Sequence, residues 1–577
     1  MKELEFDTVV YGTGITASLI AASLTRNGFR VLQVDFHSSY GGDYRTFTFK
    51  QIISEQDVVK LPEDSQGISE EGEQSPASQQ LVDQLGKNNP LYEHKVFYQV
   101  SPFSDNVDST HESLLRESSR YAIDLWPKFI YSKSAAVELF LRSSSDTYLR
   151  FCSNSGPILI GREGEPELNE VCNSKGSIFR SKYLEPMEKR ILMKFINELS
   201  DLVNTKVFSS DSLKRVDFEV DSQGSRFQGL EEDGTELWVD FLRRKNFTEK
   251  MIELTSHGIC LGGNEYKEWT KTDGLKRLLK YVESIGVFGD LGGCLLYTLY
   301  GTSDIVHALC RLSAVHGCTF MLNTFVESVH TNEGKVSGIT LSNSIFVKTK
   351  MLISEYLIPG HFVEHAQVLE HLHVISFVTK TPLFEGPNIA VLVPRSENDE
   401  PIHVIQTDLD SGTAPKGAYV LHLMTVDKAP PSHLTSFNDT TGVAARLIDA
   451  YKSLPVEIES TALALYTTHK LGDARDKIAQ IDAHQGFLGE KDKETNDTDK
   501  VGFIQIPPPK GRPAVLLLEE VSLAHYICAR LLGKEVNNLD LYDRIDLDKF
   551  LDFEKAEEEV ESSPFDKLDE IIEKFSS

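Results

Sequence analysis

Two glycines and an acid near the start of the chain have the spacing of a dinucleotide-binding turn. Residues 12–17 read Gly-Thr-Gly-Ile-Thr-Ala, and Asp35 follows about twenty positions after Gly14. Small residues let the backbone approach a pyrophosphate, the N-terminus of the next helix attracts that anion, and the acid accepts a hydrogen bond from a ribose hydroxyl. Gly12, Gly14 and Asp35 are therefore candidate ligands of FAD, a cofactor for hydride and electron transfer.

The same three residues could instead build only a tight corner between a strand and a helix. A flavoenzyme of this architecture also needs a late strand that leads into a glycine–acid turn for the ribityl phosphate. Residues 354–360 read Ser-Glu-Tyr-Leu-Ile-Pro-Gly, which is no such turn, and the C-terminal region offers none either. We therefore expect a degenerate turn without a bound cofactor. The sequence indicates neither catalytic residues nor a metal site.

The elements that must position this turn read as a βαβ unit. Phe6–Tyr11 is an apolar run with β-branched residues, a helical pattern continues to Asn27, and Arg30–Asp35 forms a second strand. Strand, glycine turn and helix in this order predict a Rossmann-like core of the FAD/NAD(P)-binding type. The expected fold class is α/β, with an antiparallel sheet beside this core and an inserted, mostly helical domain.

Composition and periodicity divide the chain into two domains and a tail. We expect residues 1–125 and 293–540 to form one discontinuous FAD-binding-like domain, because strands resume at Cys294–Tyr300. Residues 51–90 indicate a flexible acidic insertion, and residues 541–577 an acidic amphipathic tail. Residues 126–292 are expected to be mostly helical. The predicted helices are Ala135–Leu141, Pro186–Leu199, Phe241–Cys260 and Gly274–Ile285, with a further buried helix over Val515–Leu532.

The composition of the 577 residues excludes several classes of function. A formal net charge of -28 argues against nucleic acid and anionic bilayers as resident partners. The seven cysteines include no CxxC pair, which is typical of reduced thiols in a cytoplasmic protein. No apolar run approaches the roughly 18 residues of a membrane-spanning helix. The N-terminus shows no signal-peptide layout, so we expect a cytoplasmic protein with at most transient membrane contact.

Residues 300–323 form a second segment with functional potential. They read as a turn, a helix of about a dozen residues and a short strand. Asp304 and Arg311 are seven positions apart, which is two helical turns, so their side chains can share one face. On these residues alone, the segment could equally be a surface helix packed on a sheet.

Four motifs occur in order along the chain. They are Gly12-Thr-Gly14, Tyr40-Gly41-Gly42, Asp124-Leu-Trp-Pro-Lys128, and the block from Leu299-Tyr-Gly to Phe320-Met321-Leu-Asn323. With these motifs the chain resembles the superfamily of GDP-dissociation inhibitors and Rab escort proteins. The last motif is long and specific, whereas the first alone is weak. The resemblance implies a flavoenzyme-like fold that has lost its flavin and that works by binding, not by catalysis.

The resemblance also implies which residues contact a GTPase. In this superfamily the Tyr-Gly-Gly turn and the block that ends in Phe-Met form a binding platform. The implied residues here are Tyr40, Gly41, Gly42, Asp304, Arg311, Phe320 and Met321. Asp304 stands where the family usually has Glu, and Phe320 where it usually has Tyr. The shorter acid and the missing hydroxyl would tune the platform to different GTPases.

A second implied contact separates escort proteins from dissociation inhibitors. Escort proteins hold a geranylgeranyl transferase through a Phe and an Arg eleven positions apart, on neighbouring helices. Phe179 and Arg190 have this spacing. The alternative is a core Phe and a merely solvated Arg, but the escort-like stretch 187–195 and the length of the chain favour the escort branch. A recycling Rab dissociation inhibitor and, in a different class, an FAD-dependent oxidoreductase are the competing interpretations.

The partners implied by the resemblance are GDP-bound Rab-family small GTPases, the alpha/beta heterodimer of Rab geranylgeranyltransferase, and the geranylgeranyl lipid of the prenylated GTPase. The chain would present the C-terminal cysteines of the GTPase to the transferase and then deliver the prenylated GTPase to a membrane. An apolar groove in the helical domain would cover the lipid, since burial stabilises it by ~0.8 kcal/mol per methylene. The sequence does not identify the residues of that groove.

Overall fold

Five sheets organise the part of the chain that the computed structural model describes. That part comprises residues 3–55, 58–60, 96–104, 107–171, 175–207, 236–288, 293–332, 335–356, 358, 368–428, 437, 441–472, 502–506 and 518–532. Most of the acidic insertion predicted at 51–90, and the whole tail predicted at 541–577, lie outside the described residues.

A five-stranded parallel sheet contains the βαβ unit that the sequence predicts. Its strands, in spatial order, are β13 (Thr319–Met321), β3 (Val31–Val34), β2 (Thr8–Tyr11), β17 (Met351–Ser354) and β23 (Phe503–Gln505). The earliest of them in the chain, β2, lies in the middle, and later strands are added outwards on both sides. This is the strand order of a Rossmann half, so the predicted Rossmann-like core is confirmed.

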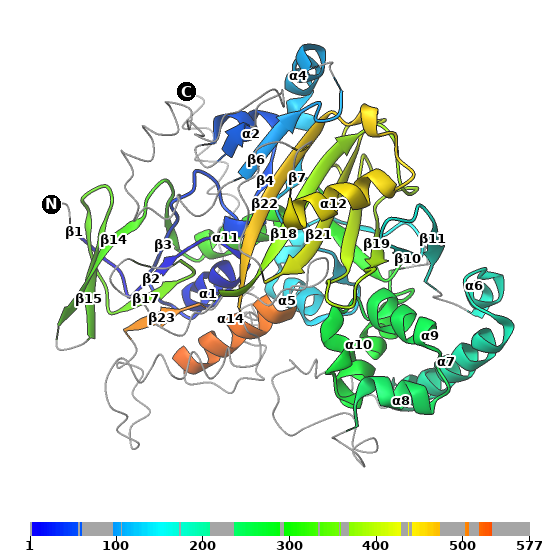
Figure 1. The fold of residues 1–577 in the computed structure, drawn as a ribbon. Coiled ribbons are helices and arrows are strands. Elements are labelled where there is room, and N and C mark those ends of the chain that lie inside the picture. The colour runs from blue at the N-terminus through cyan, green and yellow to red at the C-terminus, as the bar shows by residue number, and fades with distance from the viewer. Residues whose placement is uncertain are drawn as a thin grey trace, which may run out of the picture.

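Helices cover one face of this sheet and a smaller sheet covers the other (Figure 1). Helix α1 (Ile15–Arg26) is buried along almost its whole length because both α11 (Ser303–Val315) and α14 (Leu518–Leu531) pack on it. The opposite face shares an apolar core with a four-stranded sheet. Its strands are β1 (Glu3–Glu5), β16 (Phe346–Lys348), β15 (Lys335–Leu341) and β14 (Val326–Asn332).

The largest sheet supplies the antiparallel part of the predicted fold. Its nine described strands, in spatial order, are β11 (Leu168–Glu170), β10 (Leu159–Arg162), β19 (Asn388–Val393), β20 (Ile402–Thr407), β21 (Tyr419–Asp427), β18 (Val368–Thr379), β22 (Leu463–Gly472), β6 (Val96–Val100) and β5 (Val58–Lys60). Helix α12 (Gly442–Ser453) packs on one face, where the rings of Phe377 and Tyr451 stack with 3.9 Å between their centroids. The other face belongs to the core that also contains α1.

Residues 126–292, predicted as an inserted helical domain, form most of their structure as helices. These are α5 (Ala135–Ser143), α6 (Lys175–Arg180), α7 (Pro186–Val207), α8 (Trp238–Arg244), α9 (Glu249–Glu253) and α10 (Lys271–Ser284). Short strands occur there too: β8 (Ile130–Tyr131) and β9 (Phe151–Ser153) pair with β12 (Leu295–Thr298), and β10 pairs with β19. The domain limits themselves stay a prediction.

One predicted helix, over Phe241–Cys260, is not continuous. The helix breaks after Arg244, where Asn246 adopts a left-handed φ of 66°. Thr248 then accepts a hydrogen bond from the backbone N–H of Met251 and begins α9 as its N-cap. Asn and Thr are residue types that commonly end and begin helices, so the break has a local cause.

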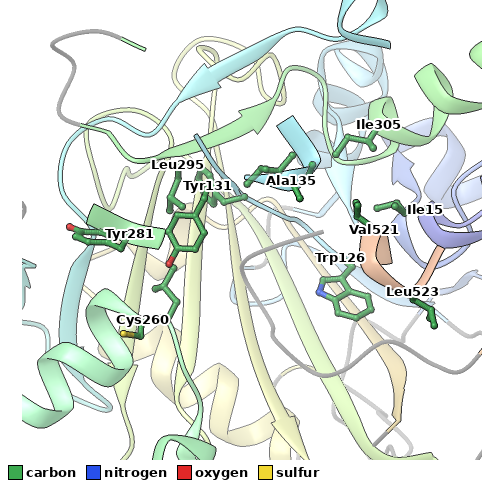
Figure 2. Close-up of a cluster of buried hydrophobic side chains, with 14 of the residues drawn as sticks. Ile15, Trp126, Tyr131, Ala135, Cys260, Tyr281, Leu295, Ile305, Val521 and Leu523 are labelled. Atoms are coloured by element: carbon green, nitrogen blue, oxygen red, sulfur yellow. The ribbon is translucent and has the colours of Figure 1, made fainter. Parts of the chain in front are cut away.

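One large apolar core joins the parallel sheet to the helical part of the chain. Figure 2 shows a section of it, in which Ile15 of α1 lies beside Val521 of α14, and Tyr131 of β8 lies beside Leu295 of β12. The same core continues into α10, where Tyr281 is buried. The helices between residues 126 and 292 are therefore packed on the sheets and not merely tethered to them.

The remaining α-helices and strands of the described residues lie at one end of the large sheet (Figure 1). They are the paired strands β4 (Thr46–Phe47) and β7 (Ile123–Asp124) and the helices α2 (Phe49–Ser54) and α4 (Val107–Arg116). The six cysteines in the described ranges form no disulfide. Among the described residues, no helix combines the length and apolar character needed to cross a bilayer. Within the same ranges, no three side chains of His, Cys, Asp or Glu gather as a metal site would require.

Candidate functional site

The predicted dinucleotide turn is occupied by a side chain of the protein itself. The turn joins β2 to α1, and Glu355 directly follows the neighbouring strand β17. The carboxyl oxygens of Glu355 accept hydrogen bonds from the backbone N–H groups of Gly14, at 2.8 Å, and Ala17, at 3.1 Å. These N–H groups, at the start of a helix, are the ones that a cofactor pyrophosphate would use. The turn as folded does not fit a dinucleotide.

The glycines of the turn make room for this glutamate. A Cβ on either Gly12 or Gly14 would collide with the Glu355 side chain. Gly12 also has a φ of 125°, a conformation that favours glycine. Burial raises the pKa of the Glu355 carboxyl to about 8, while the N–H groups of Ala17 and Gly14 act to lower it. The space that the two glycines leave open is therefore filled by the Glu355 side chain and not by a cofactor.

Asp35, the acid predicted to bind a ribose hydroxyl, likewise forms its hydrogen bonds with groups of the protein. Asp35 is fully buried, and its carboxylate accepts hydrogen bonds from the hydroxyls of Thr13, at 2.5 Å, and Tyr356, at 3.2 Å. His37 donates its backbone N–H to the same carboxylate at 2.9 Å, and its Nδ1 lies 2.8 Å from Oδ1. Burial acts to raise the pKa of Asp35, but His37 and Thr13 outweigh it, so the pKa lies below its usual value.

The Tyr-Gly-Gly turn packs directly on the Gly12–Gly14 turn that Glu355 fills. Gly41 donates its backbone N–H to the Thr13 hydroxyl at 3.0 Å. Gly41 and Gly42 have φ values of 124° and 55°, so both positions favour glycine. Tyr40, half-buried at the start of the turn, packs edge to face on Phe320 of β13, with 5.4 Å between ring centroids. Two predicted contact residues from distant parts of the chain are thus brought together.

Helix α11 presents the predicted charged residues on its outer side. Asp304, His307 and Arg311 follow one another at helical spacing, and the last two are exposed. Ile305 and Leu309, on the other side of the helix, are buried in the core. The sequence prediction that Asp304 and Arg311 share one face is therefore confirmed.

Aromatic contacts tie this helix face to the turn. His307 packs edge to face on Tyr40 with 6.1 Å between ring centroids, and its Nδ1 lies 3.5 Å from Oδ1 of Asp304. The guanidinium of Arg311 lies 4.4 Å from the centre of the Tyr148 ring, a cation–π contact. We call these residues the platform: the exposed or half-buried side chains of Tyr40, Asp304, His307, Arg311 and Phe320, together with the buried Gly41 and Gly42 that shape the turn.

Sequence reasoning missed two residues of this region and grouped one differently. His307 could have been found, because it lies three residues after Asp304 on a predicted helix. Tyr148 carries no sequence signal, because it meets Arg311 only in the folded chain. Met321 follows Phe320 in β13 and therefore points to the opposite face of the strand, where it packs on the core under β14. The structure does not bring Met321 into the platform.

A buried carboxylate fixes the start of α11. Asp124 accepts hydrogen bonds from the backbone N–H and the hydroxyl of Thr302, at 3.0 and 2.7 Å. The hydroxyl of Tyr297 donates to the same carboxylate at 2.5 Å, and that of Thr46 also donates to it. Burial raises the pKa of Asp124, although these hydrogen bonds oppose the shift. The Asp124–Lys128 motif thus supports the platform from inside.

The predicted transferase contact lies on a separate surface, at the corner between α6 and α7. Phe179 is 67% exposed and Arg190 is also exposed. Ile178 and Leu192, beside them in the chain, are buried, so the corner is anchored in the core. The ammonium of Lys189 donates to the backbone carbonyl of Phe179 at 3.1 Å and ties the two helices together. The alternative in which Phe179 is a core residue is wrong.

Comparisons with known proteins show what the chain is similar to. The model of the GDP dissociation inhibitor family matches residues 97–435. The chain is similar to Rab proteins geranylgeranyltransferase component A 1 of Caenorhabditis elegans, at 27% identity, over 72% of this chain and 78% of that protein. It is also similar to Rab escort protein 1 of Arabidopsis thaliana, at 25% identity, over 78% of this chain and 80% of that protein. The crystal structure of a Rab GDI from Plasmodium falciparum shares the fold, with a TM-score of 0.58 and 15% identity over 92% of this chain and 99% of that one.

Proposed function

This chain belongs to the GDP dissociation inhibitor family, and from that premise we propose that it is a Rab escort protein. It binds GDP-bound, unprenylated Rab GTPases and presents their C-terminal cysteines to the alpha/beta heterodimer of Rab geranylgeranyltransferase. It then escorts the prenylated Rab to a membrane. Support comes from the relatives, which are named component A of that transferase or Rab escort protein and are matched over more than two thirds of their length.

The platform is the proposed GTPase-binding surface. It combines an aromatic pair, Tyr40 and Phe320, with the acid Asp304 and the cation Arg311 within one small area. Aromatic and arginine side chains at the centre of an interface commonly carry most of the binding free energy. Gly41 and Gly42 contribute by holding the turn, and Met321 belongs to the proposed contacts through the resemblance alone.

One observation carries the choice of an escort protein over a dissociation inhibitor. Phe179 exposes two thirds of its side chain on an anchored corner, with Met187 equally exposed at 67% on the next helix. Two large apolar side chains that remain in water on a rigid corner are suited to burial against a partner. A dissociation inhibitor, which recycles prenylated Rabs without a transferase, has no use for this contact.

Presentation requires no chemistry from the side chains of this protein. The transferase supplies the metal ion, the lipid substrate and the catalytic groups. The escort protein positions the flexible Rab tail and then covers the attached geranylgeranyl chain with an apolar groove among residues 126–292. Covering the lipid stabilises the complex because exposed methylenes are costly in water, at ~0.8 kcal/mol each.

An FAD-dependent oxidoreductase remains the rival from a different class. Such an enzyme requires an open pyrophosphate site at the start of α1, but here Glu355 accepts hydrogen bonds from the backbone N–H groups of Gly14 and Ala17. We therefore expect the purified protein to show no flavin absorbance. A flavin spectrum that survives gel filtration would revive the rival.

Titration calorimetry with a purified Rab GTPase tests the first step of the proposal. The GDP-bound form should bind more tightly than the same GTPase loaded with a non-hydrolysable GTP analogue. The complex should then retain the transferase in a pulldown. Absence of binding to several Rab GTPases would contradict the proposed function.

A further inference from the structure

Glu355 stands where the parallel sheet reverses its order. Strand β2 lies between β3 and β17, and the carboxyl ends of β2 and β17 face the same edge. In sheets of this kind, the crevice between the two central strands is where cofactors bind. The backbone N–H of Glu355 donates to the carbonyl of Tyr11, the last residue of β2, at 2.8 Å. The Glu355 side chain therefore projects into the crevice from the end of β17, one of the two strands that border it.

The carboxyl group of Glu355 accepts hydrogen bonds from the backbone N–H groups at the start of α1, as a bound ligand would. The first N–H groups of a helix have no acceptor within the helix. Gly14, the N-cap residue of α1, has no side chain that could accept them. Glu355 supplies both acceptors instead, one oxygen to Gly14, 341 positions away in the chain, and the other to Ala17, 338 positions away.

The Tyr-Gly-Gly turn rests on the same corner. A Cβ on Gly42 would lie 3.1 Å from the hydroxyl of Tyr356 and 3.4 Å from the backbone nitrogen of Gly14, so the turn touches the filled crevice. The Thr13 hydroxyl links the Gly12–Gly14 turn to the Tyr-Gly-Gly turn, since it donates a hydrogen bond to Asp35 and accepts one from the N–H of Gly41. A change in the conformation of the Gly12–Gly14 turn is therefore expected to shift the position of Tyr40.

We infer that Glu355 is a built-in substitute for the cofactor pyrophosphate and the positioning residue of the Tyr40 turn. Its carboxyl group closes the cofactor crevice and holds the glycine corner in the shape on which the turn rests. The effect on GTPase binding rests on the proposed function, whereas the closing of the crevice does not. One side chain thus couples the loss of a cofactor site to the formation of a docking surface.

Chemical rescue tests this role. The Glu355→Ala substitution removes a carboxymethyl fragment, whose free counterpart is acetate. Acetate should raise the melting temperature of the Glu355→Ala protein, but not that of the wild type, relative to sodium chloride at the same ionic strength. Without acetate the variant should bind a Rab GTPase at least about tenfold more weakly, and acetate should restore affinity. Equal responses of wild type and variant, or no response of the variant, would overturn the inference.

The Glu355→Gln substitution provides a second test that keeps the volume of the side chain. Its amide offers one acceptor oxygen and turns an NH2 group towards a backbone donor. Above about pH 8, where the Glu355 carboxyl is ionised and offers an acceptor to each N–H, we expect weaker GTPase binding of the Glu355→Gln protein and no response to acetate, because no space is opened. Wild-type affinity in this variant would overturn the positioning role. If the wild type itself binds no Rab GTPase, the proposed function fails, while acetate-dependent melting of Glu355→Ala still decides whether Glu355 fills the crevice.

Discussion

The carboxylate of Asp124 accepts hydrogen bonds from the backbone N–H and the hydroxyl of Thr302, the residue at the N-cap position of α11. The two residues are 178 positions apart in the chain, and both are buried. Because Asp304 and Arg311 project from the same helix, the interior carboxylate sets the position of the outer charges.

Substitution of Asp124 by Asn should destabilise the protein without touching the platform surface. The amide keeps the shape of the side chain but places an NH2 group against donors, which costs about 1–3 kcal/mol of unfolding free energy. Denaturant unfolding measures this loss. The matched control is Asp304→Asn on the outer side of α11, which should change stability by less than about 0.5 kcal/mol but weaken GTPase binding. Equal stability of the two variants would contradict the buried role of Asp124.

Substitution of Arg311 by Ala should weaken GTPase binding on the order of tenfold, since the guanidinium is exposed and already held over Tyr148. Titration calorimetry gives the affinity. Arg243→Ala is the control, because Arg243 lies exposed on α8 and pairs with Glu249 at 2.9 Å, away from the platform. Unchanged affinity of Arg311→Ala would remove this residue from the platform.

Two buried histidines predict a loss of stability in acid. Burial lowers the pKa of both His403 in β20 and His422 in β21 to about 3. The unfolded chain takes up these protons near pH 6.5, whereas the folded chain does not until about pH 3. Stability is therefore fully present above pH 6.5 and falls as the pH decreases from there towards 3.

Denaturant unfolding at several pH values tests this dependence. His422→Gln keeps a polar group near the Ser376 hydroxyl, which lies 2.7 Å from Nδ1 of His422, but cannot take up a proton. Its stability should fall less steeply with decreasing pH than that of the wild type. Parallel curves for the two proteins would show that His422 does not contribute.

Local patterns in the sequence predicted the elements that carry the platform. The turn at Gly12, helix α1 and the block 300–323 each depend on neighbouring residues, so their periodicity and turn types are readable from the chain. That Asp304 and Arg311 share one face of α11 followed from their spacing alone, whereas the exposure of that face came from the structure. For the helix predicted over Phe241–Cys260, the signals at Asn246 and Thr248 were present but were not used.

The features that sequence reasoning missed depend on residues far apart in the chain. Nothing near Glu355 marks it as the group that fills the turn at Gly12 and Gly14, because the pairing of β17 with β2 creates that contact. The buried ion pair of Lys128 and Glu520, at 3.8 Å, likewise joins a loop to α14 only after folding. Such contacts decide whether a glycine turn is open or filled, and spacing cannot reveal them.

Reconstituted prenylation tests most directly whether this chain presents a GTPase to the transferase. With purified transferase, lipid donor and a Rab GTPase, lipid transfer should depend on the wild-type chain. Phe179→Ala should bind the GTPase with unchanged affinity yet lose most of the transfer. Phe288→Ala, a substitution of a phenylalanine that is 56% exposed elsewhere, should behave like the wild type. Lipid transfer that proceeds equally well without the chain, or that is unaffected by Phe179→Ala, would contradict the escort function.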